Sequence, residues 1–302
     1  MACVREADGK AQRRPRHRTH EPPMCRRATH AHPRECTVFR WIRLTLAGFG
    51  LLLLAAGLAL PVLAPPVAAA ACPACYGLKR AGTSLMVDRA MTATDRARLA
   101  RDLSTAGDKV RVFYGPFEPA ALVIACASQA CNQRLGGRGA LARTWATPFG
   151  DIIDLAPKGL NATILAHEFS HVALHQHAGL PAMLGETIPA WFDEGLAVIV
   201  SDDPRYLKPG AQGHERCVVS PAWPLPSSAG DWGARAGRDR MIYAQAACAV
   251  LAWMEANGGR AGALAAIDAA AGTPADAMRP AKSARLPRPG ETFLWPVRGN
   301  PL

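Results

Sequence analysis

Residues 166–171, with the sequence AHEFSH, carry the pattern that decides the fold and the chemistry of this chain. On a helix, His167 and His171 stand at i and i+4, so they share one face with their Cβ atoms about 5–6 Å apart. Two imidazoles at this separation can reach one metal ion, and the spacing is typical of zinc sites. Glu168 follows the first histidine, where its carboxylate can take a proton from a water molecule that the metal activates.

A helix from about 162 to 178 is predicted to carry this motif. Asn161 is a suitable N-cap, and Gly179 suits the position just after the helix. Apolar residues recur at i, i+4 and i+7 on the face expected to meet the core: Leu165, Phe169 and Val172. The alternative is a pair of solvated histidines on a surface helix, and the sequence that follows argues against it.

A third candidate ligand, Glu194, lies twenty-three residues after His171. Residues 188–200 are predicted to form its helix, with Pro189 in the first turn. Catalytic zinc uses three protein ligands and keeps one position open, so two histidines and this glutamate would suffice. Gly195 costs a helix about 1 kcal/mol relative to alanine, which is expected where close helix packing at the metal leaves no room for a side chain.

These motifs resemble the gluzincin branch of the HExxH metallopeptidases, and more closely the small bacterial peptidases grouped as peptidase MA-like. Such proteins carry HExxH, a linker and W-x-x-EG-x-A. The matching residues here are HEFSH at 167–171 with Trp191, Glu194, Gly195 and Ala197. The resemblance is specific over about 160–203 and looser over 110–155 and 240–257. It implies an α+β, zincin-like (thermolysin-like) domain, with a small mixed sheet over the HExxH helix and a helical part after it.

The same resemblance implies a role for each matched polar residue. His167, His171 and Glu194 would be ligands of Zn²⁺, and Glu168 would be the general base. A strand edge above the metal would hold an extended peptide, and residues 144–155 are expected to form it.

In two places the sequence departs from the family pattern. Thermolysin-like enzymes orient a histidine with an aspartate one turn after the glutamate ligand, and Val198 stands at that position here. Asp193 and Asp202 are both candidates for this role, and the sequence does not choose between them. The family's oxyanion-stabilising residue has no fixed motif. Tyr243, on a later helix, is the candidate, and a half-buried structural aromatic is the alternative interpretation.

Three more residues near the motifs are assigned roles outside the metal shell. His175 continues the stripe of His167 and His171 but lies a further turn along, so it is expected at the surface or as a hydrogen-bond partner. Tyr206 is expected to pack against the end of the second helix, with a place in the cleft as the alternative. Trp191 is expected to anchor the core.

Residues 44–63, LTLAGFGLLLLAAGLALPVL, form a run of twenty residues without a charge. At about 1.5 Å rise per residue such a helix crosses a bilayer core of roughly 30 Å, so a transmembrane helix or signal anchor is predicted. Residues 1–43 hold eleven basic and four acidic side chains, a leader that stays cytoplasmic. We therefore expect a single-pass inner-membrane protein whose catalytic domain is periplasmic or extracellular. Secretion after cleavage near residues 67–71 is the alternative.

Composition and charge exclude several classes of protein. With 49% hydrophobic and 20% charged residues, the chain is neither wholly disordered nor a multi-span membrane protein. The net charge is +11, and residues 1–43 carry +7 of it. A nucleic-acid-binding domain carries its charge on the folded surface, so nucleic acid is not expected as a partner.

Six cysteines follow the apolar run, an even number on the side of the membrane predicted to be oxidising. One possible pairing is Cys72 with Cys75, Cys126 with Cys131 and Cys217 with Cys248, but six cysteines allow fifteen connectivities and the sequence does not choose among them.

The chain is expected to divide into five segments: a basic leader (1–43), the apolar helix (44–63), a linker (64–79), the metallopeptidase-like domain (80–274) and a disordered tail (275–302). Within the domain, periodicity predicts the following elements. They are a helix at 89–104, a strand at 110–114, a helix at 119–134, a hairpin at 140–155, two helices in 160–202, a loop at 203–236 and two helices in 238–271.

The function expected from these features is that of a membrane-anchored zinc metallopeptidase acting on a peptide or protein substrate. One alternative is a catalytically silent zincin-fold protein that binds peptides or components of the cell envelope. A zinc hydrolase acting on a non-peptide amide is another, and it would differ only in its cleft.

Overall fold

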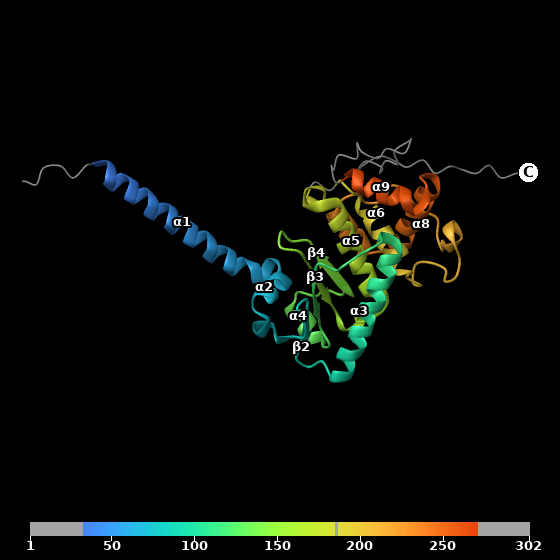
Figure 1. The fold of residues 1–302 in the computed structure, drawn as a ribbon, viewed down its shortest axis with the longest axis horizontal. Helices are drawn as coiled ribbons and strands as arrows, with labels where there is room; N and C mark the ends of the chain where they lie inside the picture. Colours follow the sequence, from blue (N-terminus) through green and yellow to red (C-terminus); the bar gives the residue numbers. More distant parts are fainter. Residues whose placement is uncertain (1–32, 185–186, 271–302) are drawn as a thin grey trace, which may run out of the picture. The chain divides into compact units, whose positions relative to one another are not determined.

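The computed structural model describes residues 33–184 and 187–270 (Figure 1). The chain divides into two compact units, residues 1–55 and 56–302. Residues 1–32 of the predicted basic leader lie outside the described residues. So does the segment from residue 271, which includes the tail predicted to be disordered.

Helix α1 (Pro33–Leu63) contains the predicted apolar run. Its stretch Trp41–Leu63, 23 residues with a mean hydropathy of 2.3, is long and apolar enough to cross a membrane. Thr45 satisfies its hydroxyl within the helix, by donating to the carbonyl oxygen of Trp41 at 3.0 Å. An apolar helix that satisfies its own polar groups is what a bilayer requires, and length and composition are the evidence for a span here.

A mixed sheet of five strands, in the order β1-β2-β3-β5-β4, forms the centre of the second unit. The strands are β1 (Leu78–Arg80), β2 (Leu85–Asp88), β3 (Ala121–Ala125), β4 (Ala142–Trp145) and β5 (Asp151–Leu155). Strands β2, β3 and β5 run parallel, while β1 and β4 pair antiparallel at the two edges. The predicted hairpin at 140–155 is confirmed as β4 and β5.

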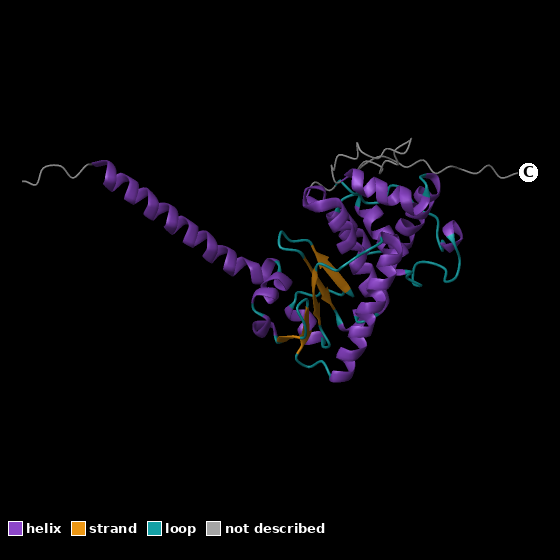
Figure 2. Cartoon of the chain, in the orientation of Figure 1, coloured by secondary structure: helices purple, strands orange, loops and turns teal. Residues whose placement is uncertain are grey.

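Helices cover both faces of this sheet (Figure 2). Alternate residues of a strand point to opposite faces. Val123 of β3 accordingly faces the large core with helices α3 (Ala93–Tyr114) and α5 (Ala162–Leu184), whereas Ile124 faces a smaller core that includes Ala69 of helix α2 (Pro65–Ala71). Residues 64–79, expected to be a linker, are thus built into the folded unit.

The remaining helices pack beyond α5 (Figure 1). They are α6 (Ala190–Ser201), α7 (Ala229–Ala236), α8 (Ile242–Ala256) and α9 (Gly259–Ala270), with α4 (Gln129–Arg134) on the other side of the sheet. Short 3-10 turns cover Pro73–Tyr76, Pro157–Gly159 and Gly213–Arg216. The two predicted helix pairs, in 160–202 and 238–271, are confirmed.

The predicted strand at 110–114 is wrong, because these residues form the last turn of α3. The helix starts at an N-cap, Thr92, whose hydroxyl oxygen accepts from the amide of Asp95, and it runs past residue 104 to Tyr114. Val110, Phe113 and Tyr114 are buried at helical spacing, while Val112 is 81% exposed. The alternation of bulky residues that suggests a strand is therefore one flank of an amphipathic helix.

Two further predictions need correction. Residues 119–134 are not one helix but strand β3 followed by α4, with Ser128 as the N-cap between them. The segment 203–236 is not all loop, since it contains the turn at Gly213–Arg216 and α7. In both places short elements are fixed by tertiary packing, which outweighs local composition.

The three predicted disulfides are present: Cys72–Cys75, Cys126–Cys131 and Cys217–Cys248. The second closes the turn from β3 into α4, and the third ties the segment after α6 to α8. Disulfides form and persist in oxidising compartments, so the second unit suits an exported location.

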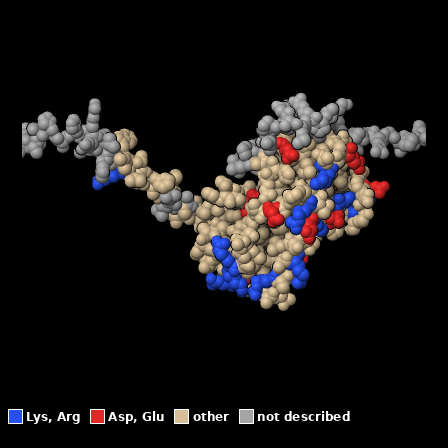
Figure 3. Space-filling model, viewed as in Figure 1, with Lys and Arg blue, Asp and Glu red and all other residues tan. Residues whose placement is uncertain are grey.

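Charge is unevenly spread over the face of the molecule shown in Figure 3. Lys and Arg gather around β2 and the first turns of α3, whereas basic and acidic side chains are interspersed over the C-terminal helices. On this face the folded unit thus combines one basic end with a surface of mixed charge.

Candidate metal centre

Helix α5 presents the HEFSH motif as predicted. Asn161 caps its start, since its side-chain oxygen accepts from the amide of Ile164 at 3.1 Å. Gly179 has a φ of 74°, outside the helical region, and interrupts the helix at the expected place. The predicted apolar face, Leu165, Phe169 and Val172, is buried in the core. The burial of that face fixes the direction in which the two histidines project.

Helix α6 brings Glu194 opposite those histidines. Trp191 anchors this helix in the core as expected, with its ring edge-on to Phe192. A Cβ on Gly195 would lie 2.5 Å from the carbonyl oxygen of Ala246 and 2.8 Å from a methyl of Val250. The close packing predicted at Gly195 is therefore confirmed, but its partner is α8 and not the metal-binding helix.

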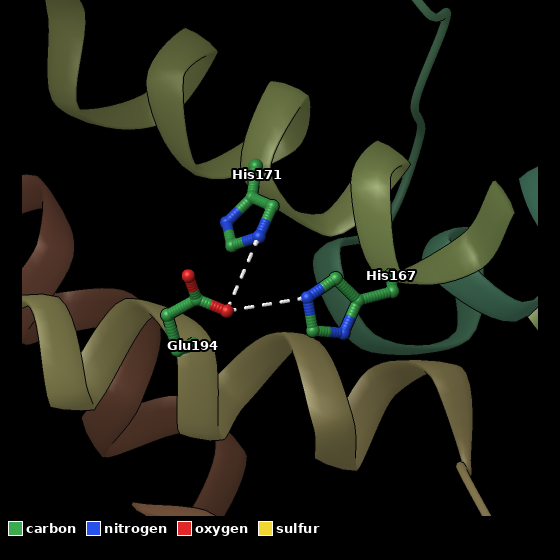
Figure 4. A group of neighbouring side chains, drawn as sticks. All are labelled: His167, His171 and Glu194. Atoms are coloured by element: carbon green, nitrogen blue, oxygen red, sulfur yellow. Dashed lines mark hydrogen bonds and ion pairs between the residues drawn. The ribbon is translucent and has the colours of Figure 1, made fainter. Parts of the chain in front are cut away.

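The three candidate ligands converge on one point (Figure 4). Glu194 Oε2 lies 3.3 Å from His167 Nε2 and 3.8 Å from His171 Nε2, and all three ligand atoms lie within 4.8 Å of one another. A tetrahedral zinc ion about 2.0–2.1 Å from each ligand would hold such atoms roughly 3.4 Å apart. Two imidazole nitrogens and one carboxylate oxygen are also a donor set used by catalytic zinc sites. This buried group fits a single metal ion.

Asp193 supports one of these ligands directly. Its Oδ1 lies 2.7 Å from His171 Nδ1, so the imidazole can donate its Nδ1 hydrogen there and turn Nε2 toward the ligand group. Burial alone would lower the pKa of His171, but Asp193, Glu194 and Glu168 outweigh it and raise that pKa to about 10. Asp202, the other candidate, instead pairs with Arg216. Of the two candidates, Asp193 is therefore the one placed to orient His171.

The environment of His167 is different. Its Nδ1 is buried without a hydrogen-bond partner among the described residues. The ring packs edge-on against the ring of Tyr243, with centroids 6.1 Å apart, and near-perpendicular to the ring of His171 at 4.9 Å. One histidine of the candidate ligand group is thus oriented by a carboxylate and the other by aromatic packing.

Glu168 is buried between α5 and the edge strand β4. Its Oε2 accepts a hydrogen bond from the hydroxyl of Thr144 at 2.7 Å. Burial raises the pKa of Glu168, and the neighbouring histidines offset part of that rise. Thr144 belongs to the segment expected to border the site, and β4 forms a sheet edge there, whereas β5 is an interior strand.

A cleft of about 410 Å³ opens beside His167 and Glu168. Tyr243 lines it, and burial, reinforced by the charge of Glu194, raises the pKa of the tyrosine hydroxyl, which keeps it protonated. Tyr206 also lines the cleft, with its ring stacked on that of Tyr243 at 5.2 Å. Tyr206 is also buried in the core just after α6, so both the expected packing and the alternative place in the cleft are observed.

His175 and His177 do not join the ligand group. His175 Nδ1 lies 2.9 Å from a carboxylate oxygen of Asp151, and His177 Nδ1 lies 3.2 Å from one of Asp268. The candidate ligands on α5 are therefore His167 and His171, and His175 lies outside the group, as expected.

Comparison of the chain with protein-family models, with curated proteins and with solved structures gives no match. A function for this protein is therefore inferred from the geometry of the site.

Sequence reasoning missed three residues of the site: Thr144, Arg205 and Arg240. Thr144 is a common residue in a short strand, and its partner Glu168 lies on another element. Arg205 and Arg240 lie outside the HEFSH and W-x-x-EG-x-A motifs. Only the tertiary fold brings them to the cleft.

Proposed function

We propose that this protein is a membrane-anchored zinc metallopeptidase that hydrolyses peptide bonds. The observation that carries the proposal is the convergence of His167, His171 and Glu194 beside a buried carboxylate, Glu168, that lines an open cleft. When bound, a zinc ion would supply a Lewis acid that polarises the scissile carbonyl and lowers the pKa of water.

Glu168 would act as general base and then as general acid. Its Oε2 is engaged by Thr144 at 2.7 Å, which fixes the orientation of the carboxylate. The carboxylate would accept the proton of the attacking water and pass it to the leaving amine. Because Thr144 already orients the Glu168 carboxylate, this general base does not have to reorient during the reaction.

Tyr243 would donate a hydrogen bond to the carbonyl oxygen as negative charge develops on it. Its ring is held in place by Tyr206 and Trp232, whose centroids each lie 5.2 Å from its own. Because Tyr243 and Glu168 line the same cleft, one substrate can meet both residues.

Strand β4 would bind the substrate backbone. It lies at an edge of the sheet, and Ala142 at its start lines the cleft. An extended peptide can add to such an edge by main-chain hydrogen bonds. A sheet edge above the HExxH helix, with helices following, is also what a zincin-like fold would require.

The anchoring part of the proposal rests on the apolar stretch Trp41–Leu63 and its basic flank. The positive-inside rule would place residues after 64 across the membrane, and the three disulfides agree with an oxidising compartment there.

The test is peptide hydrolysis by the full chain in detergent, beside Glu168→Gln. The glutamine retains the size and the hydrogen bond to Thr144 but cannot take a proton, so the rate should fall by about 10²–10⁴ while zinc stays bound. Glu215→Gln, at an exposed glutamate in the turn Gly213–Arg216, is the control and should keep the wild-type rate. Zinc binding without hydrolysis by the wild type would favour a peptide-binding protein instead.

A further inference from the structure

Besides His167 and Glu168, the side chains that line the cleft include two arginines and two tyrosines. Arg205 and Tyr206 follow helix α6, and Arg240 and Tyr243 flank the start of α8. None of them is a candidate metal ligand, and Tyr243 is the proposed oxyanion donor, so the two arginines are the charged groups left to bind another part of the substrate.

Arg205 is already paired within the protein. Its Nε donates to both carboxylate oxygens of Asp203, at 2.9 and 3.0 Å, and the Asp203 side chain is fully buried. The guanidinium lies over the ring of Tyr206, 5.0 Å from the centroid. Arg205 therefore positions Tyr206, and its charge is largely neutralised.

Arg240 is not neutralised in this way. No carboxylate lies within ion-pair distance of it in the described ranges, 33–184 and 187–270. Its neighbour Asp239 instead accepts from the amide of Met241 at 2.8 Å. The guanidinium reaches toward the carbonyl of Gly139, at 3.5 Å, on the segment that leads into β4. The positive charge of Arg240 therefore lies at the cleft, close to strand β4, which is proposed to bind the substrate.

Tyr206 lies within the influence of this charge. Burial raises the pKa of the Tyr206 hydroxyl, and the charges of Arg205 and Arg240 offset part of the rise. Tyr206 and Tyr243, whose rings stack at 5.2 Å, line the same cleft as Arg240.

We propose that Arg240 binds a carboxylate of the peptide substrate close to the scissile bond. The inference rests on the peptidase function proposed above and narrows its substrates to peptides with a carboxylate close to the scissile bond. The carboxylate can belong to an Asp or Glu side chain or to a free C-terminus, and both present the same planar anion to the guanidinium. A charge-assisted hydrogen bond at a partly exposed site should change affinity by about tenfold.

The test measures binding apart from turnover, using zinc-loaded full-length chain with Glu168→Gln. The probes are acetylated alanine hexapeptides in which one Glu or Gln is moved along the chain, each with a free or an amidated C-terminus. Isothermal titration should show about tenfold tighter binding for a carboxylate at one register than for its amide. A preference for Glu over Gln assigns a side-chain subsite, and a preference for the free C-terminus assigns carboxypeptidase-like recognition.

Arg240→Gln in the same background should remove this preference, and Arg240→Lys should retain part of it. Arg238→Gln, an exposed arginine two residues away that does not line the cleft, is the matched control and should leave the preference unchanged. Equal binding of acid and amide, no measurable binding of any probe, or a preference that survives Arg240→Gln would overturn the inference. Hydrolysis by the wild type without carboxylate preference would overturn it while leaving the peptidase proposal intact.

Discussion

The two walls of the cleft are built in different ways. The ligand wall lines the cleft with His167 and Glu168 of α5, which like His171 are less than 10% exposed, and it continues through His171 to Glu194 on α6. The other wall carries Arg205 and Arg240, two exposed residues on segments between helices. Packed helices hold groups within the narrow limits that chemistry requires, whereas residues on connecting segments tolerate variation. We infer that the residues of the ligand wall carry out the reaction and that the arginines of the other wall select the substrate.

Removing the Tyr243 hydroxyl tests whether this residue acts in the reaction or in substrate binding. Tyr243→Phe should lower kcat by about 10²–10³ with zinc content unchanged, because the developing oxyanion loses a donor. Steady-state kinetics with metal analysis measures this. Tyr76→Phe, at a tyrosine outside the cleft, should leave kcat at the wild-type value. A change in KM alone would place Tyr243 with the substrate-binding wall instead.

The support of the ligand wall is tested at Asp193. Asp193→Asn should weaken zinc binding about 10–100-fold, since the His171 imidazole loses the carboxylate that orients it. Competition with a zinc chelator measures the affinity. Asp202→Asn removes the other candidate, which pairs with Arg216 away from the site, and should leave the affinity unchanged. Equal effects of the two changes would show that Asp193 has no orienting role.

The packing behind the ligand wall is tested at Gly195. Gly195→Ala should destabilise the fold by about 1–3 kcal/mol, because the new methyl group meets the backbone of Ala246 at 2.5 Å. Urea unfolding gives the change in free energy. Gly233→Ala in α7 is the control, since no atom lies within 4 Å of its new methyl group, and it should be neutral or stabilising by up to about 1 kcal/mol. Similar stabilities of the two variants would mean that α6 and α8 are free to move apart.

The sequence predicted the ligand wall far better than the wall that carries Arg205 and Arg240. The HEFSH helix, its cap at Asn161 and the position of Glu194 follow from periodicity and spacing within one or two helices. The hydrogen bond from Thr144 and the reach of Arg240 toward Gly139 join residues 24 and 101 positions apart. Such contacts depend on how strands and helices pack, and local sequence does not encode them.

The same distinction explains the errors in secondary structure. The segment Val110–Tyr114 alternates like a strand, yet its burial is helical because α5 and the sheet pack on one flank of α3. Strand β3 has too few residues to show a period of its own, and its place between β2 and β5 fixes it as a strand.

The central claim is that His167, His171 and Glu194 hold a zinc ion. X-ray absorption at the zinc edge of the purified full chain tests it most directly. We expect one zinc per chain, with two imidazole nitrogens and a carboxylate oxygen at about 2.0–2.2 Å and one further light atom. A chain that binds no zinc, or zinc held by sulfur at about 2.3 Å, would contradict the account.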